Sequence, residues 1–185
     1  MTQNESAALI LIDWQKGFSD LAYWGNRNNR AAEENGATLL AHWRAVGWPV
    51  IHVRHDSITP QSRLHPDHPG HAFIDFASPR DGEPIYGKLV NSAFIGTTLE
   101  TDLRARGIQN IVLCGISTDH CVNTTTRMGG NLGFDVTVAA DACYAFDRQL
   151  PDGRVFSADV VHDVALASLN GEFAAVKTVA QIIAG

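Results

Sequence analysis

The sequence is poor in cysteine, and this scarcity limits the chemistry open to it. Its 185 residues include three cysteines, Cys114, Cys121 and Cys143, and no two of them form a CxxC pair. An odd number of cysteines without paired spacing argues against a disulfide framework, and the absence of CxxC argues against a zinc ribbon or a thioredoxin-like motif. We therefore expect these thiols to be structural or catalytic.

Long apolar runs and basic clusters are missing as well. No apolar run approaches the ~18 residues that cross a bilayer, and the first residues lack the basic and apolar regions of a signal peptide. Lys and Arg number 14 against 20 Asp and Glu, which gives a net charge of −6 at pH 7. No Lys/Arg cluster offers a nucleic-acid surface. We therefore expect a cytoplasmic protein that binds neither membranes nor nucleic acids.

Several motifs of known chemistry are also absent. No GxGxxG or Walker A pattern follows a strand-like run, so nothing in the sequence supports a nucleotide cofactor. The zinc motif HEXXH and the serine-nucleophile motif GxSxG do not occur. The sequence therefore predicts no cofactor.

What the sequence does contain is an alternation of short apolar runs with helical patterns. The length and the 45% hydrophobic content predict one domain over residues 1–185. Strand-like runs cover 7–12, 48–53, 108–115, 134–141 and 173–179, and helical patterns cover 31–46, 96–107, 121–132, 157–171 and 179–184. This alternation predicts βαβ units, a parallel sheet and an open three-layer α/β domain.

Local signals predict several helix ends. Gly47 and Gly107 stand where helical patterns stop, and Ser157 is typical of an N-cap. Thr97 and Glu100 have the spacing of a capping box. The segment 54–90 holds five of the seven prolines and is predicted to be irregular; connections this long are usually functional.

Three polar residues occupy positions that suggest chemistry. Asp13 directly follows the first strand-like run, where a poorly hydrated carboxylate needs a partner, although Asp is also common in turns. Lys88 lies in an apolar context, but taken alone it is more typical of a surface lysine. Cys121 follows a strand at the start of a helical pattern, where backbone N–H groups and the helix dipole favour a thiolate. Its alternative is a small buried apolar residue, the interpretation that suits Cys114 and Cys143.

If the three converge at the carboxyl ends of parallel strands, they form a nucleophile, a proton acceptor and a charge organiser. The histidines offer a competing interpretation. His52 and His55 are three residues apart, and the same step recurs at His65, His68 and His71. Imidazoles and carboxylates together can hold Zn, Fe or Mn, but a Pro- and Gly-rich loop that faces solvent or substrate also explains them.

At these residues the chain resembles the isochorismatase-like cysteine hydrolases, a superfamily that includes nicotinamidases and N-carbamoylsarcosine amidases. The resemblance runs over nearly the whole chain and rests on LIDWQKGF (11–18), GKLVNSAFIGTTL (87–99), GISTDHCVNTT (115–125) and DVTVAADAC (135–143). It implies a Rossmann-like, three-layer α/β/α fold with an open, mostly parallel six-stranded sheet. It also implies a homo-oligomer, either a dimer or a tetramer.

The resemblance assigns roles to particular residues. By motif it implies a catalytic set of Asp13, Lys88 and Cys121. It implies a cis peptide bond between Ile116 and Ser117, which is unusual where no proline follows. The N–H groups of Ser117 and Cys121 would then hold the oxyanion of the reaction.

The resemblance also bears on the pocket, the metal and the substrate. Phe18 matches a pocket aromatic of nicotinamidases, and Trp14 is expected beside it. Metal-binding nicotinamidases carry Asp-x-His after the second strand, where this chain has His55 and Ser57, so no metal is expected. Because isochorismatases need no cysteine, Cys121 favours a small-molecule amide over isochorismate. The alternatives are a metal-dependent nicotinamidase, an isochorismate vinyl-ether hydrolase and an inactive binding module of the same fold.

Overall fold

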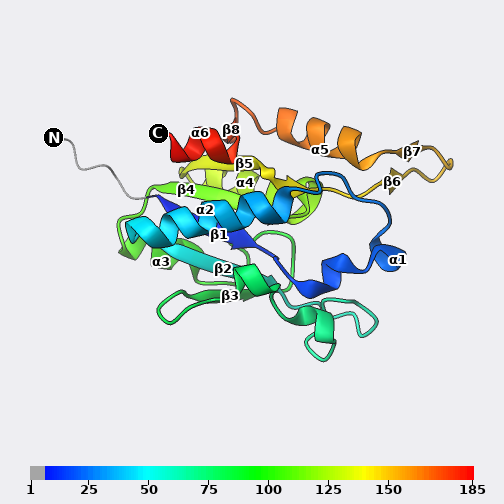
Figure 1. The fold of residues 1–185 in the computed structure, drawn as a ribbon, viewed down its shortest axis with the longest axis horizontal. Coiled ribbons are helices and arrows are strands. Elements are labelled where there is room, and N and C mark those ends of the chain that lie inside the picture. The colour runs from blue at the N-terminus through cyan, green and yellow to red at the C-terminus, as the bar shows by residue number, and fades with distance from the viewer. Residues whose placement is uncertain (1–6) are drawn as a thin grey trace.

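Six parallel strands form the centre of the computed structural model, which describes residues 7–185 (Figure 1). In sheet order they are β3 (Ile85–Lys88), β2 (Val50–His55), β1 (Ala8–Ile12), β4 (Asn110–Ile116), β5 (Asp135–Tyr144) and β8 (Ala175–Lys177). The expectation that the chain lacks a signal peptide rests on its first residues, and residues 1–6 lie outside the described part.

β1 lies in the middle of the sheet, and its composition explains why. All five of its residues, Ala-Leu-Ile-Leu-Ile, are buried, as expected for a strand covered by helices on both faces. In the parallel register Leu9 is opposite Val50 of β2 on one side and Val112 of β4 on the other. The strand therefore fixes the position of whatever follows Ile12.

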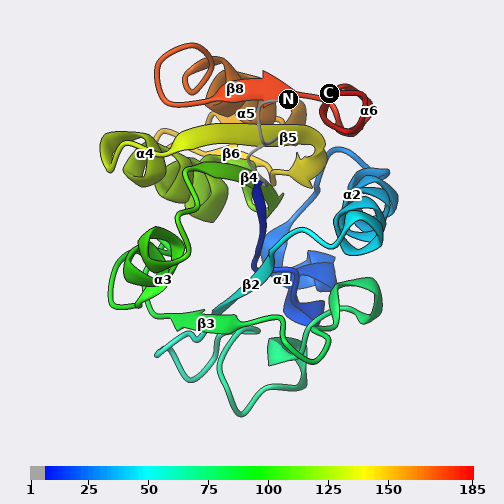
Figure 2. The ribbon, with the colours of Figure 1, turned by 90° about the vertical axis from the view of Figure 1, so that its left-hand side faces the viewer.

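Helices cover both faces of the sheet and complete the three layers. α2 and α6 pack on one face, and α3 and α4 lie on the other (Figure 2). The helices are α1 (Leu21–Trp24), α2 (Ala32–Val46), α3 (Leu99–Ala105), α4 (Asn123–Asn131), α5 (Ala158–Ala167) and α6 (Val179–Ile183). The predicted three-layer α/β fold is confirmed. Within residues 7–185 no helix is long and apolar enough to cross a membrane.

A separate antiparallel hairpin, β6 (Arg148–Gln149) with β7 (Val155–Phe156), was not predicted. It projects from the body of the protein between β5 and α5 (Figure 1). All six strands of the main sheet run parallel, so the antiparallel pairing is confined to this hairpin.

Two of the predicted helix ends are confirmed. α2 ends at Gly47, which adopts a left-handed conformation with φ 71° and donates its N–H to Trp43 O. α5 begins after Ser157, whose hydroxyl accepts a hydrogen bond from the N–H of Val160. Both ends use the residue types that satisfy orphan backbone groups of a helix.

The capping box predicted for Thr97 and Glu100 is wrong. The N-cap of α3 is Thr98, and the hydroxyl of Thr97 instead accepts from the N–H of Leu99 at 3.3 Å. Glu100 pairs one turn along with Arg104, at 2.9 Å. The spacing suggested that the Glu100 carboxylate would accept from a backbone N–H. It instead pairs with the opposite charge one turn away on the same helix face.

The segment 54–90 was predicted to be irregular, but it contains the edge strand β3. It also holds two short helical turns, η2 (Pro69–His71) and η3 (Asp75–Ala77), while η1 (Lys16–Ser19) follows β1. β3 is four residues long and three of them are not buried, so it gives no apolar run in the sequence. Its pairing with β2 places Lys88 opposite His55.

A polar cluster ties this segment to α2 and β2 through Glu83. Glu83 accepts from Arg44 at 2.8 Å and lies 2.8 Å from the ring of the fully buried His52. Partial burial alone would raise the pKa of Glu83, but hydrogen bonds from Arg44, the N–H of Arg80 and His52 lower it to about 2. His52 is thus held by a carboxylate in the core.

Candidate active site

The candidate site lies where the carboxyl ends of four neighbouring strands meet. From β1 the chain builds the sheet outward through β2 and β3, and it then returns to add β4 on the other side of β1. The strand order therefore reverses between β1 and β4, which is where open α/β sheets form their binding crevices. Lys88 ends β3, His55 ends β2, Asp13 follows β1 and Ser117 follows β4.

The ammonium group of Lys88 is the centre of this cluster. Its Nζ lies 2.7 Å from Asp13 Oδ2, 3.0 Å from His55 Nδ1 and 3.2 Å from Cys121 Sγ. Lys88 is 1% exposed, and an ammonium has three protons to donate. Three polar neighbours therefore surround this ammonium inside the protein, Asp13 as an ion pair and His55 and Cys121 within hydrogen-bond distance.

Lys88 carries its charge in this setting. Burial alone would lower its pKa, but the Asp13 carboxylate and the Cys121 thiol act in the opposite sense, and the net effect raises the pKa of Lys88 above its ordinary value. A buried charge needs such compensation to persist. Lys88 is thus not the surface lysine that its residue type alone would suggest.

Asp13 is placed by an unusual backbone conformation at the end of β1. Its φ is 53°, in the left-handed region that Asp tolerates better than most residues, and its N–H donates to Val53 O of β2. Its side chain is fully buried. Oδ2 forms an ion pair with the Lys88 ammonium at 2.7 Å, but neither carboxylate oxygen accepts a hydrogen bond of good geometry among residues 7–185. One carboxylate oxygen is therefore available to take a proton.

Cys121 lies within η4 (Thr118–Val122), a single π-helical turn between β4 and α4, and not at the first residue of the helix as predicted. Burial, followed by the Asp13 carboxylate, raises its pKa well above the ordinary range, and this outweighs the lowering effect of Lys88. Burial and Asp13 therefore favour the protonated thiol, which is the direction opposite to the thiolate expected at a helix start. A thiol whose pKa is raised needs a base before it can act as a nucleophile.

The strands around the thiol approach one another closely at Gly115. Its φ is 140°, and a Cβ built there would lie 2.0 Å from the carbonyl oxygen of Ile12. Glycine is therefore required for β4 to pass the end of β1 at this distance. Shortly after Gly115, the peptide bond between Ile116 and Ser117 is cis.

A cavity of about 180 Å³ opens above the thiol. It is lined by Phe18, Trp24, His55, Leu64, Asn91, Ser117, His120, Cys121, Phe146 and Arg148. The rings of Phe18, Trp24 and Phe146 form one wall, with ring centroids 4.8–6.2 Å apart. This size and apolar wall suit a small molecule with a flat or hydrocarbon portion.

The two predicted pocket residues, Phe18 and Trp14, lie in different places in the structure. Phe18 lines the cavity, whereas Trp14 is fully buried in the core against Phe76 and Tyr144. The placement of Trp14 beside the substrate is therefore wrong. Side chains of successive residues after a strand point in different directions, so adjacency to Asp13 in sequence did not bring Trp14 to the cavity.

A polar group at the cavity mouth was not predicted. Arg148, on the β6–β7 hairpin, donates to Asp119 at 2.7 Å, and Asp119 also accepts from the hydroxyl of Ser117 at 2.8 Å. His120 lies beside them, and Asn91 reaches within 3.7 Å of Cys121 Sγ. His120 stands next to the thiol in the sequence and could have been proposed from that alone, but nothing in the sequence links Arg148 to it.

His65, His68 and His71 of the long segment do not line the cavity. His71 Nε2 lies 2.7 Å from the Asp56 carboxylate. The rings of His65 and His68 each accept a hydrogen bond from the backbone N–H two residues further along. Turn formation therefore accounts for His65 and His68, and the contact with Asp56 accounts for His71. Among the histidines considered for a metal, only His55 reaches the cluster.

The residues of the cluster do not fit a metal ion. Asp13, His55 and Cys121 offer ligand atoms within 4.8 Å of one another. However, the Lys88 ammonium already contacts all three of those residues. A cation bound among them would lie against this buried positive charge, because both would need the same carboxylate, imidazole and thiol.

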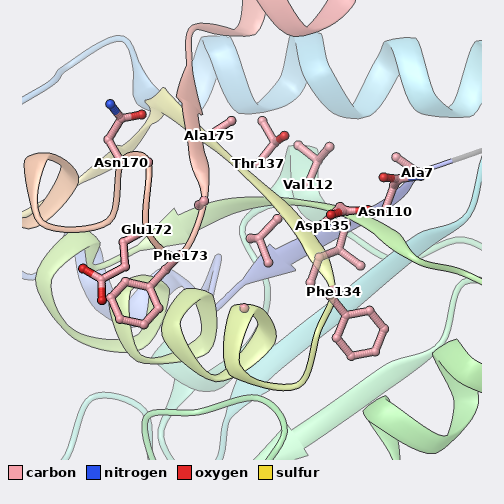
Figure 3. A pocket seen from close by; sticks show the side chains of 15 residues that line it. Ala7, Asn110, Val112, Phe134, Asp135, Thr137, Asn170, Glu172, Phe173 and Ala175 are labelled. Carbon is pink, nitrogen blue, oxygen red and sulfur yellow. The ribbon is translucent and has the colours of Figure 1, made fainter.

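A larger hollow, of about 570 Å³, lies at the opposite end of the sheet (Figure 3). It is formed by the amino ends of β4 and β5 and the loop before β8, including Asp135, Glu172 and Phe173. It holds no cysteine, histidine or lysine. We place the chemistry in the smaller cavity because the nucleophile and its charged partners converge there.

Comparison with known proteins identifies the family. The isochorismatase domain model matches residues 7–181, which is nearly the whole chain. The chain therefore belongs to the isochorismatase family.

Relatives of this chain support the same assignment. The isochorismatase family protein YrdC of Bacillus subtilis is 45% identical over 179 residues, covering 97% of this chain and 95% of YrdC. A crystal structure of an isochorismatase-family protein from Chromobacterium violaceum is 48% identical, with a TM-score of 0.94 over 98% of this chain and 94% of that one. The ureidoacrylate amidohydrolase RutB of Klebsiella pneumoniae is 28% identical over 174 residues, covering 76% and 74%.

Proposed function

We propose that this isochorismatase-family hydrolase is a metal-independent cysteine amidohydrolase that cleaves a non-peptide C–N bond of a small molecule. The observation that carries the proposal is the buried contact of one ammonium, Lys88, with both a carboxylate and a thiol at the base of a cavity. The similarity to RutB, an amidohydrolase, supports the same reaction class.

The first half of the proposed reaction forms a thioester. Asp13 takes the proton of the Cys121 thiol, and the sulfur attacks the carbonyl carbon of the amide. The N–H groups of Ser117 and Cys121 stabilise the resulting oxyanion. The C–N bond then breaks, and Asp13 returns the proton to the departing ammonia or amine.

The second half regenerates the enzyme. Asp13 takes a proton from water, and the hydroxide attacks the thioester carbonyl. The C–S bond breaks, the acid leaves, and the Cys121 sulfur recovers the proton from Asp13. Lys88 remains charged throughout, and it stabilises first the carboxylate and then the thiolate as negative charge moves between them.

The base in this scheme is Asp13, although a histidine lies next to the thiol. Lys88 is a donor without acceptor capacity, so its contact with His55 Nδ1 occupies the lone pair of that nitrogen. Asp13 Oδ1 is unpartnered within residues 7–185, and the raised pKa of Cys121 means that a base is needed. The carboxylate is therefore the better-placed proton acceptor.

The test is an activity screen over nicotinamide, N-carbamoyl, ureido and maleamate amides, with intact-protein mass spectrometry of the enzyme during turnover. We expect release of ammonia or amine and an acyl adduct on Cys121. Cys121→Ala should abolish both, and Asp13→Asn should abolish turnover while the protein remains folded. Cys114→Ala, which removes a buried thiol from β4, is the matched control and should retain activity.

Other results would point elsewhere. Turnover that survives in Cys121→Ala would refute the thioester and favour vinyl-ether hydrolysis of isochorismate, which needs no thiol. Activity lost to a chelator, with about one metal per chain, would favour a metal-dependent nicotinamidase. A wild-type protein that binds amides without hydrolysing them would be a binding module.

A further inference from the structure

His55 is a half-buried residue that the proposed reaction does not use. It is the last residue of β2 and the register partner of Lys88, and it lines the cavity together with Cys121. The proton scheme above needs only Asp13 and Lys88. A histidine in this position therefore needs an account of its own.

The contact with Lys88 fixes which ring nitrogen of His55 carries a proton. An ammonium can only donate, so Nδ1, at 3.0 Å from Nζ, must offer a lone pair. A neutral imidazole has one protonated nitrogen, and here that is Nε2. Burial and the Lys88 charge lower the pKa of His55, which favours the same neutral form.

The backbone of His55 is held as firmly as its ring. The Gln15 side chain accepts from the N–H of His55 at 2.8 Å and donates to its carbonyl oxygen at 3.1 Å. The same amide also donates to the carbonyl oxygen of His71 at 3.0 Å. Gln15 is 1% exposed. A ring fixed through both its backbone and Nδ1 is preorganised to bind a ligand through its remaining polar atom.

The other polar groups that line the cavity indicate what kind of ligand His55 Nε2 could bind. Within residues 7–185 no carboxylate lines the cavity, whereas Asn91 and Arg148, whose side chains carry N–H groups, both line it. His55 adds one further N–H from the end of β2, whereas Ser117 follows the end of β4. The cavity is therefore rich in donors and suits a ligand that carries more than one oxygen acceptor.

We propose that His55 is a substrate-binding residue that donates a hydrogen bond from Nε2 to an oxygen of the substrate. The substrate class is thus an amide with a second oxygen acceptor, such as a carboxylate or ureido oxygen. This inference rests on the proposed function and adds the feature that selects among amides.

The protonation state of His55 can be measured without any substrate. Two-bond 15N–1H correlation spectra of the 15N-labelled protein at pH 7 distinguish the two neutral tautomers and the cation, and the spectrum of His55→Asn assigns the signal. We expect a neutral ring protonated on Nε2. A ring protonated on Nδ1, or on both nitrogens, would overturn the inference whatever the enzyme hydrolyses.

Two variants separate the functions of the two ring nitrogens. In His55→Asn the shorter side chain can still accept from Lys88 near the Nδ1 position but cannot reach the Nε2 position. In His55→Gln the amide reaches the Nε2 position but loses the acceptor at Nδ1. His65→Asn, in the turn outside the cavity, is the control.

The affinity for maleamate and for N-carbamoylglycine is then measured, as KM where they are hydrolysed and as Kd by calorimetry where they only bind. His55→Asn should weaken it about tenfold, the effect of one lost hydrogen bond of this kind, with kcat changed far less. His55→Gln should keep the affinity and lower kcat, and His65→Asn should match the wild type.

Unchanged affinity in His55→Asn would refute the role of His55 while leaving amide hydrolysis intact. Failure of the wild type to bind either amide would overturn the inference and the proposed function together. A third outcome is that the wild type hydrolyses simple amides and binds amides with a second oxygen acceptor no more tightly. That result would overturn only the proposed substrate class.

Discussion

Replacing Lys88 with methionine removes the ammonium that lies 2.7 Å from the buried Asp13 carboxylate. Methionine keeps most of the apolar stem, so the change chiefly deletes a charge and leaves little empty space. Because Asp13 is 0% exposed and Lys88 is 1% exposed, water cannot replace the lost partner without opening the core.

The expected loss in the free energy of unfolding is large. Leaving one member of a buried ion pair uncompensated costs about 3–5 kcal/mol. A domain of this size is stable by about 5–15 kcal/mol, so the variant should fold but melt roughly 6–20 °C below the wild type.

The assay is urea unfolding followed by tryptophan fluorescence for Lys88→Met, Asp13→Asn and the double variant. The double variant removes both charges, so it should be more stable than the sum of the single losses predicts, by several kcal/mol. Lys16→Met is the matched control, because Lys16 and Asp75 lie 2.9 Å apart on the surface. Exposed pairs contribute little, and we expect almost no change.

A loss below about 1 kcal/mol in Lys88→Met, or strictly additive losses in the double variant, would refute the reasoning. Either result would mean that the carboxylate and the ammonium are not each other's main compensation. The proposed transfer of negative charge from Asp13 to Cys121 would then lose its structural basis.

Three further predictions follow from the same structure. Iodoacetamide should modify Cys121 of the free protein faster with each rise in pH up to 9 without a plateau, since its pKa is raised; Cys114, buried with its pKa raised to about 12, should stay unmodified. Glu83→Gln should be less stable than the wild type at pH 7, and urea titrations should show the gap shrinking as pH falls from about 4.5 towards 2, where native Glu83 takes up its proton. Gly115→Ala should lower the melting temperature strongly, because its Cβ would overlap the carbonyl oxygen of Ile12; unchanged melting would contradict the close approach of β1 and β4.

The sequence was most informative where apolar runs and motifs coincide. The apolar run 7–12, which contains β1, predicted both the strand and the position of Asp13 at its end. β3 was missed because an edge strand with one buried residue leaves no apolar run. The prediction of a dimer or tetramer stays a prediction.

The site shows the same division. Residue type and motif singled out Asp13, Lys88 and Cys121, and the structure brings them together around one ammonium. The cavity wall was largely missed: Trp24 and Phe146 lie 122 positions apart in the chain but stack at 5.7 Å. Such contacts depend on how distant loops fold over the sheet. Neither the spacing of apolar residues nor a sequence motif indicates them.

The sequence by itself determined the layered fold and the residue types of the site, because burial on both faces of a parallel strand demands continuous apolar runs, and polar residues at their ends are then conspicuous. Only the tertiary structure decided how those residues act. The pKa of Cys121 is raised because burial and a carboxylate outweigh Lys88, and His55 takes its tautomer from the same ammonium. Both effects depend on distances of a few ångströms between strands, and electrostatic interactions in a buried site change steeply over such distances.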